Sequence, residues 1–159
     1  MADTPRGRIP YVDLRGEFTP LDLVFLQRAR ARAMVEAVKD TFGAASRAPS
    51  DALLRMADRA SRRWLKQSDN PYWWEIGRMA EEIGISGVLT LNVALEWSCT
   101  GGVWQTASGP VLRRVLDWPL PRLGEFLVVL HLSGKAGGYY DVTWPGLAGV
   151  FHEIGRAHV

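Results

Sequence analysis

The chain has 159 residues, of which 47% are hydrophobic and 23% are charged, and its formal net charge is +2. This length is enough for one domain with a hydrophobic core, and so small a net charge gives no reason to expect a nucleic-acid partner. One cysteine excludes an intramolecular disulfide and a cysteine-rich zinc site.

The first half of the chain has the hydrophobic periodicity of helices. Thr19-Pro20 followed by Asp22 predicts a helix start, because proline is favoured at the first helical position. Gly43 is the predicted terminator of that helix. Three more helices are predicted, beginning near Ser50, Asn70 and Ser86. The helix from Ser50 is expected to bury the face that carries Leu53, Ala57, Ala60 and Trp64.

After Cys99 the pattern changes to short runs with the composition of strands. These runs span residues 103–104, 111–118, 125–132 and 139–144, and glycine, proline and serine separate them. Helices followed by strands indicate an α+β fold.

Neither a membrane span nor an inorganic site is indicated. No apolar run approaches the about 20 residues of a membrane-spanning helix, and the first residues lack the apolar stretch of a secretory signal. We therefore expect a cytoplasmic protein without a transmembrane segment. The three histidines have no metal-ligand spacing with a carboxylate partner, and the glycine-rich run 134–138 lacks the Lys-Ser/Thr pair of a phosphate loop. We therefore expect neither a metal nor a cofactor.

Cys99 is the candidate catalytic residue. In N-terminal-nucleophile chemistry a precursor is cut just before a Cys, Ser or Thr, and the freed α-amino group is the general base. With a pKa of about 7.7–8.0, such an amine suits proton transfer near neutral pH. Here cleavage of the Ser98–Cys99 bond would free the nucleophile. Asp117 would then hold the α-amino group, and Arg114 would supply positive charge near the thiolate and the acyl oxygen.

The same residues have a simpler interpretation. A solitary cysteine is most often a small buried hydrophobic residue, and an Arg-x-x-Asp pair is usually a surface ion pair with little energetic effect. On this interpretation the chain is a non-catalytic module, a helical bundle with a β-hairpin, that binds a protein partner or a lipid.

A series of short motifs resembles one group of N-terminal-nucleophile enzymes, the linear amide hydrolases of the acid ceramidase and N-acylethanolamine-hydrolysing acid amidase family, which are relatives of choloylglycine (bile-salt) hydrolases and penicillin acylases. The resemblance is fairly continuous from residue 75 to 151 and patchy before residue 70. The chain departs at Val115 from the family's Arg-Asn-Leu-Asp-Trp-Pro pattern. The motifs are residues 8–14, 75–85, Leu89-Thr90-Leu91-Asn92, Glu96, Cys99-Thr100, Arg114 to Pro119 and Thr143 to Val150.

The resemblance implies an αββα sandwich, two stacked β-sheets between helical layers, of which this chain contains the helical part and the first strands. Residues 1–98 would form a helical pro-segment or α-subunit-like part, and residues 99–152 the start of the catalytic β-subunit-like part. Cys99, Arg114 and Asp117 match the nucleophile, the arginine and the aspartate of the family.

The resemblance also implies a self-processing cysteine amidase that acts on small N-acyl amides and whose processed halves stay associated. An acyltransferase of the same family, in which an amine takes the acyl group, is an alternative that the sequence does not separate. A member that keeps the fold without the oxyanion donors is another. Four tryptophans are candidates either for the core or for the wall of an acyl-chain pocket, namely Trp73, Trp74, Trp97 and Trp104.

Residues 153–159 differ from the β-rich sequence that we expect after the turn at Gly146. They can be encoded by DNA that resembles a common sequencing adapter, so we expect a non-native tail. The downstream oxyanion asparagine and the late arginine of the family have no counterpart before this tail. We therefore expect the chain as it stands to be an inactive fragment, truncated at its C-terminal side.

Overall fold

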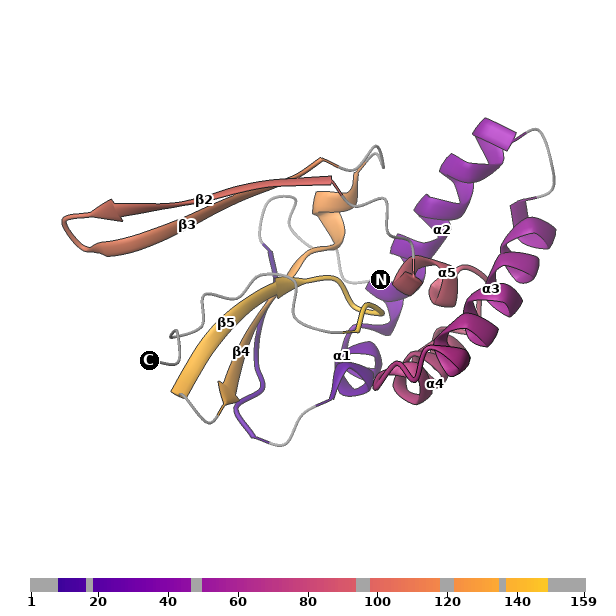
Figure 1. The fold of residues 1–159 in the computed structure, drawn as a ribbon, viewed down its shortest axis with the longest axis horizontal. Coiled ribbons are helices and arrows are strands. Elements are labelled where there is room, and N and C mark those ends of the chain that lie inside the picture. The colour runs from indigo at the N-terminus through magenta and orange to yellow at the C-terminus, as the bar shows by residue number, and fades with distance from the viewer. Residues whose placement is uncertain are drawn as a thin grey trace.

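The computed structural model describes residues 9–16, 19–46, 50–93, 98–117, 122–134 and 137–148. The fold is α+β, as the sequence predicts. The helices gather on one side of the molecule and the strands on the other (Figure 1). In chain order the elements are β1 (Tyr11–Asp13), α1 (Pro20–Leu26), α2 (Arg28–Ser46), α3 (Ser50–Gln67), α4 (Trp73–Ile83), α5 (Val88–Val93), β2 (Ser98–Thr106), β3 (Gly109–Asp117), the 3-10 helix η1 (Leu123–Phe126), β4 (Val128–Gly134) and β5 (Gly137–Thr143).

The predicted start at Thr19 is confirmed. The Thr19 side chain accepts a hydrogen bond from the Asp22 backbone N–H, and the Asp22 carboxylate accepts one from the Thr19 backbone N–H at 2.9 Å. The prediction of one continuous helix ending at Gly43 is wrong, because α1 ends before Gln27 and α2 continues to Ser46. The break lets α1 contribute to two clusters, with Leu23 packed on the sheet and Val24 among the helices.

Helix α3 buries a different face from the predicted one. Leu54 is 6% exposed, whereas Leu53 and Trp64 are 44% and 48% exposed. The buried face also carries two polar residues, Asp58 and Ser61. Their presence gives this face the composition of a solvent-exposed one in the sequence. The Asp58 carboxylate accepts hydrogen bonds from the backbone N–H groups at the start of α5, and this contact turns the face of Leu54 inwards.

Three arginines at the start of α2 connect this helix to α4 and to η1. The Arg28 guanidinium lies 3.3 Å from the Glu82 carboxylate of α4. Arg32 donates to the carbonyl of Ile83 at the last turn of the same helix, and Arg30 donates to the carbonyl of Glu125 in η1. The Arg32 contact satisfies a carbonyl that the helix end leaves without an intrahelical partner.

The described strands form two separate sheets. One has the order β1-β4-β5, with β1 parallel to β4 and β4 antiparallel to β5. One of its faces packs against Leu23 of α1, and the other presents Tyr11, His131 and Tyr140, whose rings lie together at the surface. The second sheet is the hairpin β2–β3, which extends away from the rest of the molecule (Figure 1).

No helix among the described residues is long and apolar enough to cross a membrane.

The orientation of α3 can be tested with a pair of adjacent leucines. We expect Leu54→Ala to lower the free energy of unfolding by about 2–4 kcal/mol, because it leaves a cavity in the core. Leu53→Ala, the matched control, should change it by no more than about 0.5 kcal/mol, because Leu53 is at the surface. Urea unfolding followed by circular dichroism measures both. Equal losses for the two variants would contradict the observed orientation.

Candidate functional site

The candidate nucleophile lies at the base of the hairpin β2–β3, where the structure describes the backbone. Cys99 pairs with Leu116, and its neighbour Ser98 pairs with Asp117. Gly101 pairs with Arg114. The register therefore brings the positions of Cys99, Arg114 and Asp117, which span 19 residues of chain, to one end of one antiparallel pair.

This register has a direct chemical consequence. Residues directly opposite each other in an antiparallel pair have Cα atoms about 4.5–5.5 Å apart, so position 117 lies beside the peptide bond that joins Ser98 to Cys99. Positions 99 and 114 fall on the same face of the hairpin. Arg114 pairs directly with Gly101, and Gly101 is two residues from Cys99, so the three positions share one face. The register thus places position 117 beside the Ser98–Cys99 bond and position 114 on the face of position 99, while position 117 falls on the opposite face.

Two motifs of the predicted site, 54 residues apart, meet at Asn92. Its side-chain amide donates hydrogen bonds to the carbonyls of Val88 and Gly146, both at 2.8 Å. Its carbonyl oxygen accepts one from the Ala148 backbone N–H at 2.8 Å. Sequence reasoning included Asn92 only as part of a motif and missed this function. The signal was a polar side chain following Leu89 and Leu91, which are both buried.

The turn that Asn92 holds is fitted closely to the helices. Trp144 is buried, and its indole N–H donates to the carbonyl of Leu123 at 2.9 Å. Gly146 has a φ of +101°, which glycine adopts without strain. A Cβ at Gly146 would lie 2.9 Å from Cδ1 of Ile83 in α4. The turn after β5 therefore requires glycine at this position both for its backbone and for the space beside α4.

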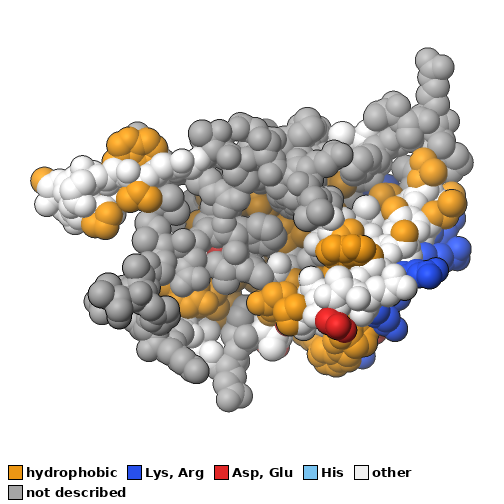
Figure 2. Space-filling model, viewed as in Figure 1, with side chains coloured by type: hydrophobic (Ala, Val, Ile, Leu, Met, Phe, Trp, Pro, Cys, Tyr) orange, Lys and Arg blue, Asp and Glu red, His pale blue; other side chains and the backbone are white. Residues whose placement is uncertain are grey.

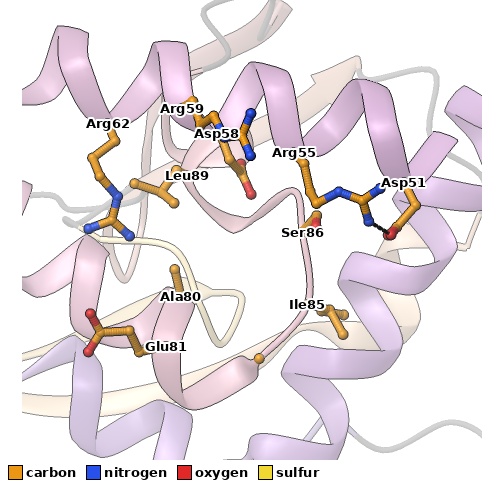
Figure 3. Close-up of a pocket in the computed structure, with 11 residues that line it drawn as sticks. Asp51, Arg55, Asp58, Arg59, Arg62, Ala80, Glu81, Ile85, Ser86 and Leu89 are labelled. Carbon is orange, nitrogen blue, oxygen red and sulfur yellow. Dashed lines mark hydrogen bonds and ion pairs between the residues drawn. The ribbon is translucent and has the colours of Figure 1, made fainter.

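Asp58 anchors a second polar contact, at one edge of a groove between α3, α4 and the segment before α5 (Figure 3). Its carboxylate accepts from the N–H of Gly87 at 2.7 Å and from the N–H and hydroxyl of Thr90 at 2.9 and 2.8 Å. The groove has a volume of about 520 Å³. Three arginines and three acidic residues line it, and Arg55 pairs with Asp51. This balance of charge gives the groove no preference for an anion or a cation.

The tryptophans contradict both sequence-based alternatives. Trp73, Trp74 and Trp104 are exposed, so they belong neither to the core nor to the wall of an enclosed pocket. The Lys66 ammonium lies 5.1 Å from the ring centre of Trp73, and the Arg78 guanidinium 5.9 Å from that of Trp74. Figure 2 shows hydrophobic side chains at the surface of the hairpin and of the helical half. Trp97 and the tail 153–159 lie outside the described residues.

Glu75, in the first turn of α4, is a carboxyl group of the resemblance motifs whose pKa is raised. Burial disfavours its charged form and raises its pKa above the ordinary 4.5. The Leu21 backbone and the Thr19 side chain favour the charged form and offset this only partly. Across the described part of the chain, no group of His, Cys, Asp and Glu has the arrangement of a metal site.

Comparison with models of known protein families gives no match, and comparison with curated proteins gives none either.

The Asn92 contact predicts a stability difference between two asparagines. Asn92→Ala removes three hydrogen bonds and leaves backbone groups of the turn unpaired, so we expect a loss of about 2–4 kcal/mol in the free energy of unfolding. Asn70→Ala, which removes a single bond to the Tyr72 N–H, should cost about 1 kcal/mol. Denaturant titration of both variants measures this. A loss for Asn92→Ala no larger than that for Asn70→Ala would contradict the assignment.

Glu75 predicts a pH dependence of stability. An acid whose pKa is higher in the folded state favours folding when protonated. Its contribution is therefore complete below pH 4.5 and is lost as the pH rises through the folded-state pKa. We expect Glu75→Gln to be more stable than the wild type above this range and to lose part of the pH dependence. Urea midpoints across the acidic range measure it, with the exposed Glu81→Gln as control. Parallel curves for Glu75→Gln and the wild type would contradict the assignment.

Proposed function

We propose that the chain is the helical part and the first strands of a self-processing cysteine amidase, which hydrolyses linear C–N bonds of N-acyl amides. The observation that carries the proposal is the register of β2–β3. It sets Asp117 opposite Ser98, beside the bond to be cleaved, and sets Arg114 on the face of Cys99.

The proposed chemistry begins with cleavage of the Ser98–Cys99 bond, which frees the α-amino group of Cys99. This amine takes the thiol proton as the sulfur bonds to the carbonyl carbon of the substrate. The C–N bond then breaks, and the proton passes to the leaving amine. Water hydrolyses the resulting thioester, so that a carboxylic acid is released and the thiol is restored. Asp117 orients the amine, and the charge of Arg114 stabilises the thiolate and the developing oxyanion.

Two features of the fold support the family assignment. Asn92 contacts Gly146 and Ala148, so two of the segments that carry the family resemblance lie together in the fold. The exposed face of the sheet, with Tyr11 and Tyr140, is where a second sheet of an αββα sandwich would pack. Uncovered aromatic side chains on a sheet face are costly in water, and a stacked sheet would bury them.

One observation favours the non-catalytic alternative. The outer face of α3 carries Leu53, Met56 and Trp64 at helical spacing, and all three are exposed. Exposed apolar stripes of this kind mark contacts with partners or lipids. Binding through α3 is compatible with amidase chemistry at the hairpin, so the experiment below concerns the chemistry alone. An acyltransferase would use the same residues with an amine in place of water.

Self-processing is the direct test. We expect a full-length version of the protein to be cut between Ser98 and Cys99, and its Cys99→Ala variant to stay intact, because that variant lacks the nucleophile. Cys99→Ser, which keeps a weaker nucleophile, should be cut more slowly. Ser98→Ala is the matched control and should be cut like the wild type, since its side chain takes no part. Intact-mass spectrometry measures all four.

Cleavage of Cys99→Ala at the same bond would overturn the proposal, as would a full-length wild-type protein that stays intact at every pH tested. For a processed chain, release of amine from an N-acyl amide in water identifies a hydrolase. Formation of a new amide with an added amine identifies an acyltransferase.

A further inference from the structure

A second cavity lies on the covered face of the β1-β4-β5 sheet, away from the hairpin that carries Cys99. Its volume is about 200 Å³. Its walls are mainly apolar and come from α1, the two long strands of the sheet and the turn that follows β5, with Leu23, Leu130 and Leu147 all buried. A cavity of about 150 Å³ with such walls holds a benzene molecule. The space therefore suits a ligand slightly larger than benzene.

Two polar side chains of β5 project into this apolar cavity. Asp141 and Thr143 line it and are each 2% exposed. They are two residues apart on one face of the strand, opposite Leu130 and Val128 of β4. Two strand steps separate them by about 6.6 Å. The cavity thus has an apolar wall and a polar floor, which is the usual composition of a small-molecule site.

The hydroxyl of Thr143 has no hydrogen-bond partner within the described part of the chain. A buried hydroxyl without a partner is destabilising, and such groups are rare in folded proteins. Valine has nearly the same shape and would avoid this cost. The presence of threonine here is explained if a bound molecule supplies the missing partner.

Asp141 determines the charge of that molecule. It already interacts within the protein, and a carboxylate has about four acceptor positions, so it can accept further hydrogen bonds. A carboxylate oxygen forms shorter and stronger hydrogen bonds with a cationic donor than with a neutral one, so we expect a further partner of Asp141 to be a cation. Neither Asp141 nor Thr143 is needed for the proposed chemistry of Cys99.

We infer that this cavity binds a small primary amine with an apolar body, whose ammonium group donates hydrogen bonds to Asp141 and Thr143. The apolar body lies among Leu23, Leu130 and Leu147. The inference is independent of the proposed amidase site, because it requires neither processing nor catalysis.

The test is a titration of the methyl-labelled chain with benzylamine, followed by NMR. We expect saturable shifts of the methyl signals of Leu23, Leu130 and Leu147. Benzyl alcohol, which has the same shape without the charge, should bind at least about tenfold more weakly. Asp141→Asn should weaken the binding of benzylamine to a similar extent. Asp13→Asn is the matched control, because Asp13 lies exposed on β1 of the same sheet, and it should leave the affinity unchanged.

Thr143→Val keeps the inference testable if Asp141→Asn fails to fold. We expect it to raise the urea midpoint, because the unpaired hydroxyl is removed, and to weaken benzylamine binding about fivefold. The inference is overturned if benzylamine leaves the three leucine signals unmoved, if benzyl alcohol binds as tightly, or if Thr143→Val has the affinity of the wild type.

Discussion

The side-chain amide of Asn92 makes the contact on which the arrangement of the two halves depends. It lies on α5, among the helices, and its three hydrogen bonds hold both the preceding turn of that helix and the backbone that follows β5. A donor and an acceptor on one planar group fix the turn in position and in orientation. Apolar packing alone is not directional and would allow the sheet to slide along α4 and α5.

Close packing around this contact leaves the turn little freedom. Trp144 fills the space between the helices and η1 and satisfies its indole N–H there. Gly146 allows the backbone to approach Ile83. The turn therefore behaves as part of the helical core, although it belongs to the sheet by sequence. Among the described residues, this turn therefore belongs to the larger apolar cluster across the helices, while a smaller cluster lies under the sheet.

Local signals in the sequence were sufficient for the starts and ends of several elements. The capping box at Thr19 and the left-handed Gly84 mark α1 and α4 without help from the rest of the fold. The face of α3 could not be predicted, because the half-buried Asp58 accepts hydrogen bonds from the start of α5 and apolar periodicity does not reveal such a contact. Apolar periodicity also gives no sign that Trp74 is exposed, with the Arg78 guanidinium 5.9 Å from its ring centre. For the candidate site, the sequence motifs pointed to Cys99, Arg114 and Asp117. Which of these positions lie opposite or beside one another could not be predicted, because it depends on how β2 pairs with β3.

That register is determined at the far end of the hairpin. Two residues connect Thr106 to Gly109, and nine paired positions lead from there to Ser98 and Asp117, a distance of roughly 27 Å at about 3.4 Å per residue. A turn one residue longer or shorter would set a different residue opposite Ser98 and would exchange the two faces of β3 along its whole length. The tip of the hairpin can therefore vary in residue type, whereas its length determines which residue lies opposite Ser98.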